Sequence, residues 1–229
     1  MLFDLKGKRR RVVQGVYLTL AILIGGGLVL FGIGGGTNGG LLDAVKGGGG
    51  GSNAEKTLNK EIAAAQKRLA LNPQDQAALV VIATDNYRLA AEKADPNTGV
   101  FTDDGKKKLN EAAGAWERYL ALNPAKPNDT LAGYMLQAYS QAGLNKPDKA
   151  KKAAEIFSEA HPSANAYIQV VFYASLAGDT RTAKLAGEKA LELAPKGQRS
   201  SVKELIKQAE AVNTTSAPSG ATGATGSGG

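Results

Sequence analysis

Few side chains in this sequence are suited to catalysis. His161 is the only histidine, there is no cysteine, and no serine or threonine has a histidine partner placed by the sequence. A serine or threonine nucleophile needs an adjacent base, so the chain offers no candidate for nucleophilic catalysis. His161 directly precedes Pro162 at the expected end of a helix, where a cation is favoured by the helix dipole, and it is interpreted as a capping residue. We therefore expect that the protein is not an enzyme.

Two segments superficially resemble ligand-binding loops. The stretch "DPNTGVFTDDGK" (Asp95–Lys106) is rich in oxygen donors, but a calcium loop needs glycine at its sixth place and glutamate at its twelfth, where this chain has Val100 and Lys106. A turn followed by a helix N-cap at Asp103 or Asp104 is the better interpretation. The glycines of "GIGGG" follow no strand and do not predict a phosphate-binding loop. The sequence predicts no metal, no cofactor and no small-molecule substrate.

The net charge of +7 over 229 residues does not indicate a nucleic-acid partner. Much of the basic excess lies in "KGKRRR" (Lys6–Arg11), directly before an apolar run, and the longer remainder of the chain is nearly balanced. A nucleic-acid-binding protein carries its basic excess on the folded domain, so no nucleic-acid partner is expected.

The apolar run that follows predicts a membrane anchor. Val12–Ile33 contains 22 residues without a charge, and a helix of that length spans about 33 Å, enough for a hydrocarbon core of about 30 Å. Because basic residues stay on the cytoplasmic side, we expect a cytoplasmic N-terminus (1–11), a transmembrane helix (12–36) and everything after it on the extracytoplasmic side of the cytoplasmic (inner) membrane. A cleaved signal peptide is the alternative, although its apolar region is normally only about 7–15 residues long. "GGGGGSN" closes an expected glycine-rich linker (37–53).

The longer middle of the chain contains a recurring pattern. "LALNP" occurs at Leu69–Pro73 and at Leu120–Pro124, and a looser copy, "KALELAPKG", contains Pro195. The intervals between Pro73, Pro124, Pro162 and Pro195 are 51, 38 and 33 residues. Proline cannot continue a helix and moves the preceding residue out of the α region, so these prolines mark the ends of helices. The composition, rich in Ala, Leu, Lys and Glu, predicts an all-α fold.

This pattern resembles the tetratricopeptide repeat, a helical hairpin of about 34 residues closed by a proline. The unit ending at Pro195 has Gly178 at its interhelical turn, Ala183 and Ala190 at the family's small positions, and Tyr167, Val170 and Val171 on its inner face. The unit before it retains the matching residues Tyr139, Gly143 and Ala150. An ordinary helical bundle is the alternative interpretation.

The resemblance covers 54–212 and implies a short solenoid of about three helical hairpins plus a capping helix. The first full unit has surplus residues in the segment 94–108, a lone second helix precedes it, and the amphipathic "GQRSSVKELIKQAEAV" would cover the last apolar face. The segment 213–229 contains almost no large apolar residues and is predicted to be a disordered tail.

The resemblance further implies a concave groove that binds a protein or an extended peptide. The groove positions, together with the apolar Phe101 of the insertion, are Val81, Asp85, Arg88, Phe101, Gln137, Ser140, Asn165, Ile168 and Phe172. The basic residues that some members use to clamp a terminal carboxylate are absent from the matching positions. Phe101 is expected either to dock on this groove near Phe172, or on a partner or lipid surface beside the anchor, or to fold back onto Trp116.

These features together predict a membrane-anchored protein–protein interaction module, a scaffold or a chaperone-like adaptor, on the extracytoplasmic side. The alternative is a structural subunit of a membrane complex or a self-assembling oligomer.

Overall fold

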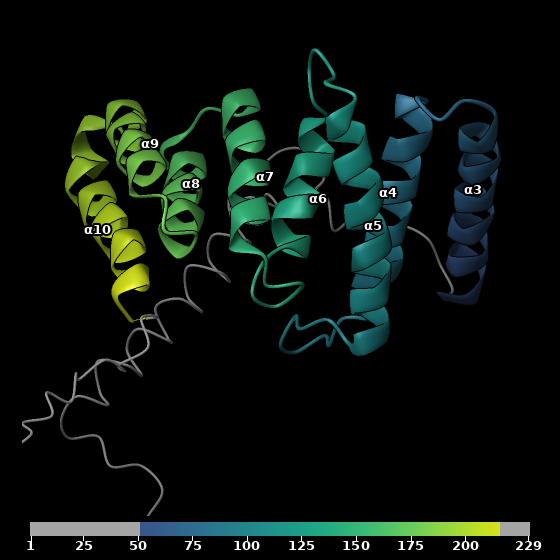
Figure 1. Cartoon of the computed structure of the whole chain (residues 1–229). Coiled ribbons are helices and arrows are strands. Elements are labelled where there is room, and N and C mark those ends of the chain that lie inside the picture. The colour runs from purple at the N-terminus through teal and green to yellow at the C-terminus, as the bar shows by residue number, and fades with distance from the viewer. Residues whose placement is uncertain (1–50, 216–229) are drawn as a thin grey trace, which may run out of the picture.

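The computed structural model describes residues 51–215, and this part of the chain is all-α (Figure 1). It contains eight α-helices and one short 3-10 helix, with no β-strand between residues 51 and 215. The helices are α3 (Gly51–Leu71), α4 (Gln76–Ala91), α5 (Asp103–Ala121), α6 (Asp129–Ala138), α7 (Pro147–Ala160), α8 (Ala164–Leu176), α9 (Thr180–Leu193) and α10 (Arg199–Thr215), with the 3-10 helix η1 (Lys196–Gln198) before α10.

The predicted cytoplasmic segment, the transmembrane helix and most of the linker lie outside the described residues. Among the residues that are described, no helix is both long and apolar enough to cross a bilayer. The expected linker boundary at residue 53 is wrong by a few residues, because α3 already begins at Gly51. Likewise α10 continues to Thr215, beyond the predicted start of the tail at 213. Each added residue of an existing helix gains a backbone hydrogen bond, so a helix can extend past its last apolar residue.

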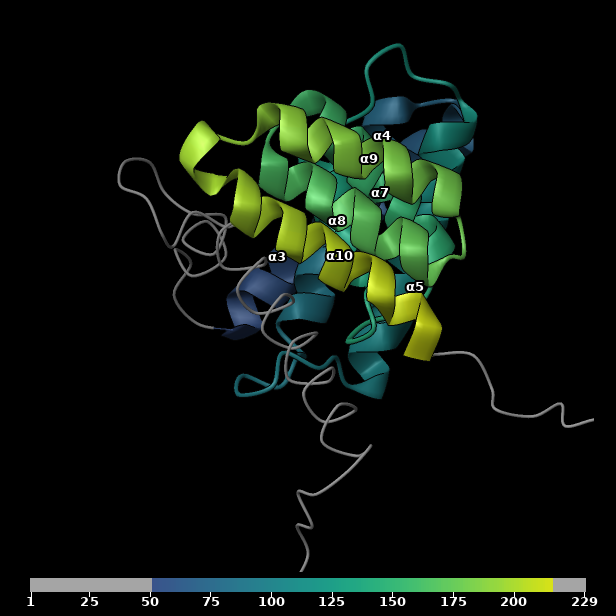
Figure 2. The same ribbon diagram turned by 90° about the vertical axis from the view of Figure 1, so that its left-hand side faces the viewer.

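The helices form an extended row with α3 at one end and α10 at the other (Figure 1). Helix α4 packs against α3, α5 and α6, and α8 packs against α7, α9 and α10. A view from the α10 end shows α8, α9 and α10 beside one another (Figure 2). Among consecutive helices, α5 and α6 share the least contact.

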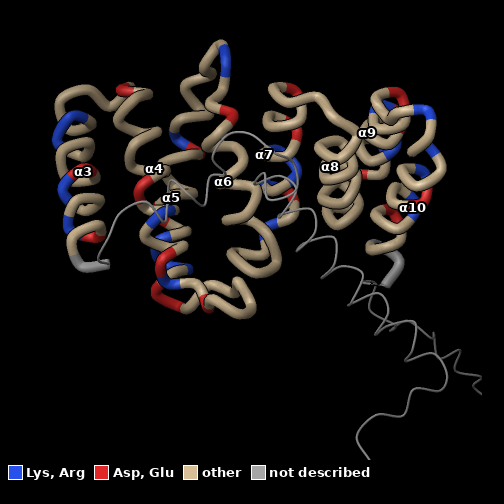
Figure 3. Tube along the Cα trace, turned by 180° about the vertical axis from the view of Figure 1, so that it is seen from behind, with Lys and Arg blue, Asp and Glu red and all other residues tan. Residues whose placement is uncertain are grey.

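The distribution of charged residues agrees with this packing. Helix α8 carries no charged residue and α6 carries only Asp129, whereas Lys, Arg, Asp and Glu are spread along α3, α5, α7, α9 and α10 (Figure 3). A helix that is covered on several sides is apolar nearly all round, and one with an exposed face carries charge on that face. The helices covered by several neighbours are thus α8 and α6, together with α4, whose charged residues are only Asp85 and Arg88.

Small residues allow close helix contacts where the sequence predicted them. Ala183 and Ala190 of α9 are buried, as is Ala150 of α7. A Cβ atom added at Gly187 would lie 3.2 Å from Cγ2 of Ile206, so α9 and α10 approach closely at that glycine. The expected turn residue Gly178 has φ of +74°, a conformation that glycine adopts without strain.

Side-chain caps define the helix starts. The caps that accept a hydrogen bond from the backbone N–H three residues ahead are Asp75, Thr102, Asn128, Ser163 and Asp179. The prediction that Asp103 or Asp104 caps α5 is wrong, because the Oγ1 atom of Thr102 accepts from Gly105 N–H at 3.2 Å. Both aspartates lie in the first turn instead, where the helix dipole stabilises negative charge.

The insertion between α4 and α5 is a folded loop. Ala94 and Phe101 form an isolated antiparallel bridge, and Asp95 N–H donates to the Val100 carbonyl at 2.9 Å. Phe101 N–H donates to the carbonyl of Ala142, beyond α6, at 3.3 Å. Its side chain is 7% exposed and belongs to the main core.

Phe101 is therefore not an exposed docking residue, and its assignment to the binding surface is wrong. Phe101 is a core residue, as the alternative expectation requires, while its contact with Trp116 itself stays a prediction. The backbone bridge turns the Phe101 side chain inward and leaves the neighbouring Val100 46% exposed.

Candidate functional site

The structure separates the predicted groove residues into three places. Val81, Asp85 and Arg88 of α4 line one hollow. Gln137 lies near the end of α6 and Ser140 in the turn after it, and Asn165, Ile168 and Phe172 lie on α8, farther along the row (Figure 1). The predicted residues therefore do not form one continuous surface.

The α8 residues are mostly part of the core. Ile168 and Phe172 are each 5% exposed, and the Phe172 ring meets Tyr173 edge to face with centroids 5.0 Å apart. Only Asn165, in the first turn, is exposed. The prediction that Ile168 and Phe172 line an open groove is wrong, because α7, α9 and α10 all pack against α8.

The next two predicted residues, Gln137 and Ser140, make contacts within the fold. Gln137 Oε1 accepts a hydrogen bond from the Tyr87 hydroxyl, and the Tyr87 ring stacks on Tyr134 with centroids 4.6 Å apart. Burial, followed by the proximity of Tyr134, raises the pKa of Tyr87, so the hydroxyl remains a donor. Ser140 is buried in the turn after α6, where its carbonyl accepts from Asn145 N–H at 2.9 Å. The Gln137 Oε1 atom and the buried Ser140 are therefore engaged within the fold, whereas the rest of the Gln137 side chain is partly exposed.

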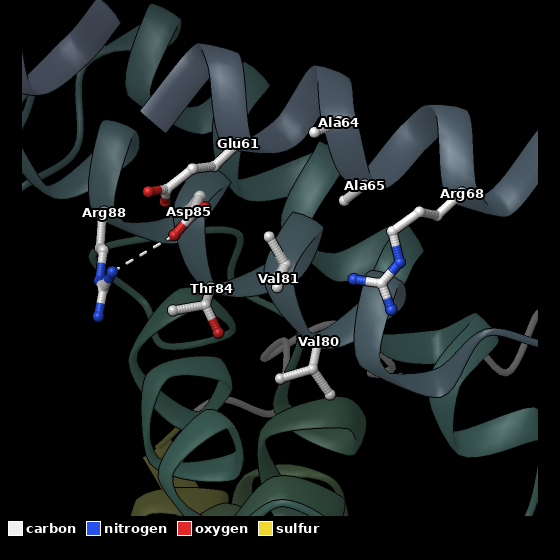
Figure 4. Close-up of a pocket in the computed structure, with 9 residues that line it drawn as sticks. All are labelled: Glu61, Ala64, Ala65, Arg68, Val80, Val81, Thr84, Asp85 and Arg88. Carbon is white, nitrogen blue, oxygen red and sulfur yellow. Dashed lines mark hydrogen bonds and ion pairs between the residues drawn. The ribbon is translucent and has the colours of Figure 1, made fainter. Parts of the chain in front are cut away.

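The hollow lies between α3 and α4 and has a volume of about 390 Å³. Figure 4 shows α3 crossing one side and α4 forming the other. Its lining residues are Glu61, Ala64, Ala65, Arg68, Val80, Val81, Thr84, Asp85 and Arg88.

Helical spacing explains why these residues meet. Glu61, Ala65 and Arg68 recur at intervals of four and three along α3, and Val81, Asp85 and Arg88 recur in the same way along α4. Residues three and four apart share one face of a helix, so each helix presents a single stripe. The two stripes face each other across the hollow (Figure 4).

Asp85 is the unusual residue of the hollow. Asp85 is only 3% exposed, and its Oδ2 atom accepts no hydrogen bond from the described residues. The Oδ1 atom lies 3.4 Å from Nη1 of Arg88 (Figure 4). Burial, followed by the adjacent carboxyl of Glu61, raises the pKa of Asp85 from 3.8 to about 6, although Arg88 lowers it. Buried carboxylates normally have all their oxygens hydrogen-bonded, so this one is incompletely satisfied.

Arg68 is already engaged at the other end of the hollow. Its Nε donates to Oδ2 of Asp75 at 3.0 Å, and its Nη2 donates to Oδ1 of the same residue at 3.1 Å. Asp75 also caps α4 by accepting from Ala78 N–H at 2.9 Å. These bonds, that from Ala78 first, hold the pKa of Asp75 below its usual range. The charge of Arg68 is therefore balanced within the fold.

Sequence reasoning missed Glu61 and Arg68. The family resemblance assigns groove positions to the first helix of each hairpin, and the same resemblance makes α3 a lone second helix. The available signal was the spacing of Glu61, Ala64, Ala65 and Arg68, which places two small residues between two charges on one helix face.

His161 ends α7, as predicted, and its backbone N–H donates to the Phe157 carbonyl at 2.9 Å. Its Nε2 atom also lies 2.6 Å from Oδ2 of Asp129 in the first turn of α6, a pairing that the sequence did not predict. Burial raises the pKa of Asp129, but hydrogen bonds, first the one from His161, lower it below its usual value. His161 therefore has a structural partner. In the part of the chain that is described, no three His, Cys, Asp or Glu side chains cluster as metal ligands would.

No protein-family description, curated protein or solved structure matches the chain. The function is therefore argued from the geometry of the helical row and its hollow.

The buried carboxyl of Asp85 should make the free energy of unfolding fall as the pH rises. Because its pKa is about 6 in the folded state and 3.8 ordinarily, the folded chain binds the proton more tightly, and this contribution to the free energy of unfolding falls as pH rises from about 4 to about 6. We expect Asp85→Asn to raise the free energy of unfolding by about 1–2 kcal/mol at pH 7.5, less than the full pKa difference implies because the amide brings its own donors.

Urea titrations of both proteins at pH 4.5 and pH 7.5 measure this effect. The difference between variant and parent should shrink markedly at the lower pH, and carboxylates that do not interact with Asp85 cancel because both proteins retain them. A difference that is the same at both pH values would contradict the assigned titration of Asp85.

Proposed function

We propose that this chain is a membrane-anchored protein–protein interaction module, a scaffold or adaptor, whose tetratricopeptide-like solenoid (54–212) lies on the extracytoplasmic side of the cytoplasmic membrane. The proposed anchor is the apolar segment 12–36, with the basic N-terminus inside. The interval between prolines, the small residues at helix contacts and the row of consecutive helices support the repeat interpretation.

The hollow between α3 and α4 is the observation on which the proposal depends. It combines an apolar floor with charged side chains, and its most buried carboxylate lacks a hydrogen-bond donor. Binding sites commonly combine an apolar lining with a few placed polar groups. A long, open row of helices also offers an extended surface to a partner, as stacked helical repeats do.

Photo-cross-linking in intact membranes tests this function. A photoreactive amino acid replaces Thr84, which lines the hollow, in the full-length chain expressed in the cells that normally produce it. The matched control places the same amino acid at Lys184, an exposed position on α9. We expect a specific cross-link to another protein from position 84 and none from position 184, as identified by mass spectrometry.

Two results would contradict the proposal. Equal products from the two positions would mean that the hollow has no special role. A product that contains only two copies of this chain would favour the alternative proposal, a structural subunit that assembles with itself.

A further inference from the structure

We propose that the hollow between α3 and α4 binds a lysine side chain from an extended segment of the partner, with the ammonium group between Asp85 and Glu61. This inference rests on the proposed function, because it specifies the chemistry of the partner at the same site.

Hydrogen bonding favours a donor between Asp85 and Glu61, because these two carboxyls can bond to each other only while one of them is protonated. Asp85 Oδ2 is buried without a hydrogen-bond partner, and an ionised carboxylate can only accept. The Oδ1 atom has only the 3.4 Å approach of Arg88, which is longer than a strong charge-assisted bond. Oδ2 of Asp85 is buried, so a donor reaches it by displacing the exposed Glu61 side chain, whose carboxyl then supplies a second acceptor (Figure 4).

Charge favours a cation with a single positive charge. Arg68 is paired with Asp75 through two hydrogen bonds, so its charge is already balanced. The charged groups that remain in the hollow are the carboxyls of Glu61 and Asp85 and the guanidinium of Arg88. With both carboxyls ionised their sum is one negative charge, which one ammonium group neutralises.

Shape favours lysine over arginine. A guanidinium binds best with both oxygens of one carboxylate in a planar fork, and Arg88 already lies beside Oδ1 of Asp85. An ammonium is compact and its donors point in three directions, so it can use one oxygen from each of two carboxyls. The methylene stem would lie along the apolar lining, which is Ala64, Ala65, Val80 and Val81.

Three tripeptides that differ in one side chain test the proposal. The probes are acetyl-Val-Lys-Val-amide, its Gln counterpart and its Arg counterpart, each titrated into the full-length protein in detergent micelles and followed by protein NMR. We expect saturable shifts at the amides of α3 and α4 around the hollow. The lysine probe should bind at least tenfold more tightly than the glutamine probe.

Variants test which carboxyls cause the preference for the lysine probe. Asp85→Asn should abolish the preference for lysine, and Glu61→Gln should weaken it several-fold at an exposed position where folding is not at risk. Glu159→Gln, which removes an exposed carboxylate from α7, should leave the preference unchanged. If Asp85→Asn disturbs the fold, as its amide spectrum would show, Glu61→Gln still decides the question.

Three outcomes would overturn the inference: equal binding of the lysine and glutamine probes, preference for the arginine probe, or shifts away from the hollow. Binding of the lysine probe only after Lys46→Gln would also overturn it, because the chain's own lysine would then be the occupant. Failure of the two proposals can be told apart. A partner cross-linked at position 84 without a lysine preference refutes only this inference, and a lysine preference without a cross-linked partner refutes only the proposed function.

Discussion

Replacing Gly143 by alanine is expected to lower the free energy of unfolding by about 3 kcal/mol through overpacking of the turn after α6. A Cβ atom at this position would lie 2.3 Å from the carbonyl oxygen of Ala138, at the end of α6. That oxygen cannot move away easily, because it accepts the Leu144 N–H at 2.8 Å and Ala138 is fully buried. The turn must therefore open to admit the methyl group.

Urea-induced unfolding followed by circular dichroism measures this loss. Gly114→Ala is the matched control, because the same substitution there, on the exposed side of α5, meets no atom within 4 Å. Alanine is a better helix former than glycine, so the control should gain up to about 1 kcal/mol. Similar unfolding midpoints for the two variants would contradict the turn geometry after α6.

Replacing Phe101 by alanine is expected to cost about 3 kcal/mol, the lower end for a buried phenylalanine. The side chain is 7% exposed and lies in the same core as Trp116. Val100→Ala is the matched control, because Val100 is 46% exposed, and its loss should stay below about 1 kcal/mol. Thermal and urea unfolding of both variants separate the two cases. If Phe101→Ala leaves stability unchanged, the insertion is not part of the core.

The helix boundaries were largely predictable because their causes are local. The prolines after α3, α5, α7 and α9 prevent continuation, and short side chains such as Asn128 and Ser163 cap the following helices. The small residues at helix contacts, Ala183 among them, followed from the repeat spacing. Each of these effects depends on a few neighbouring residues, which a single sequence displays.

The binding surface was not predictable to the same extent because it depends on how helices pack. The family resemblance assigned both Asp85 and Ile168 to the groove, yet Asp85 lines a hollow and Ile168 is covered by neighbouring helices. The hollow also needs Glu61 and Arg68 from α3, which meet α4 only in the folded chain (Figure 4). The inward turn of Phe101 depends on a bridge to Ala94 and a bond to Ala142, and no local signal encodes either.

The sparse contact between α5 and α6 has a consequence for cooperativity. In a linear array of helices, stability is approximately a sum of local terms and nearest-neighbour interfaces, so the weakest interface is where unfolding divides. Here α3–α5 and α6–α10 are joined by packing of α4 on α6, by the Tyr87–Gln137 hydrogen bond with its stacked Tyr134, and by the bond from Phe101 to Ala142. Glu117 of α5 also accepts from the Tyr139 hydroxyl at 3.1 Å and pairs with Lys149, and the Tyr119 hydroxyl accepts from Asn128 N–H at 3.0 Å. The insertion is thus one of several connections between two folding blocks. A ligand in the α3–α4 hollow would stabilise α3–α5 directly. It would stabilise α6–α10 only through the contacts that join the two blocks.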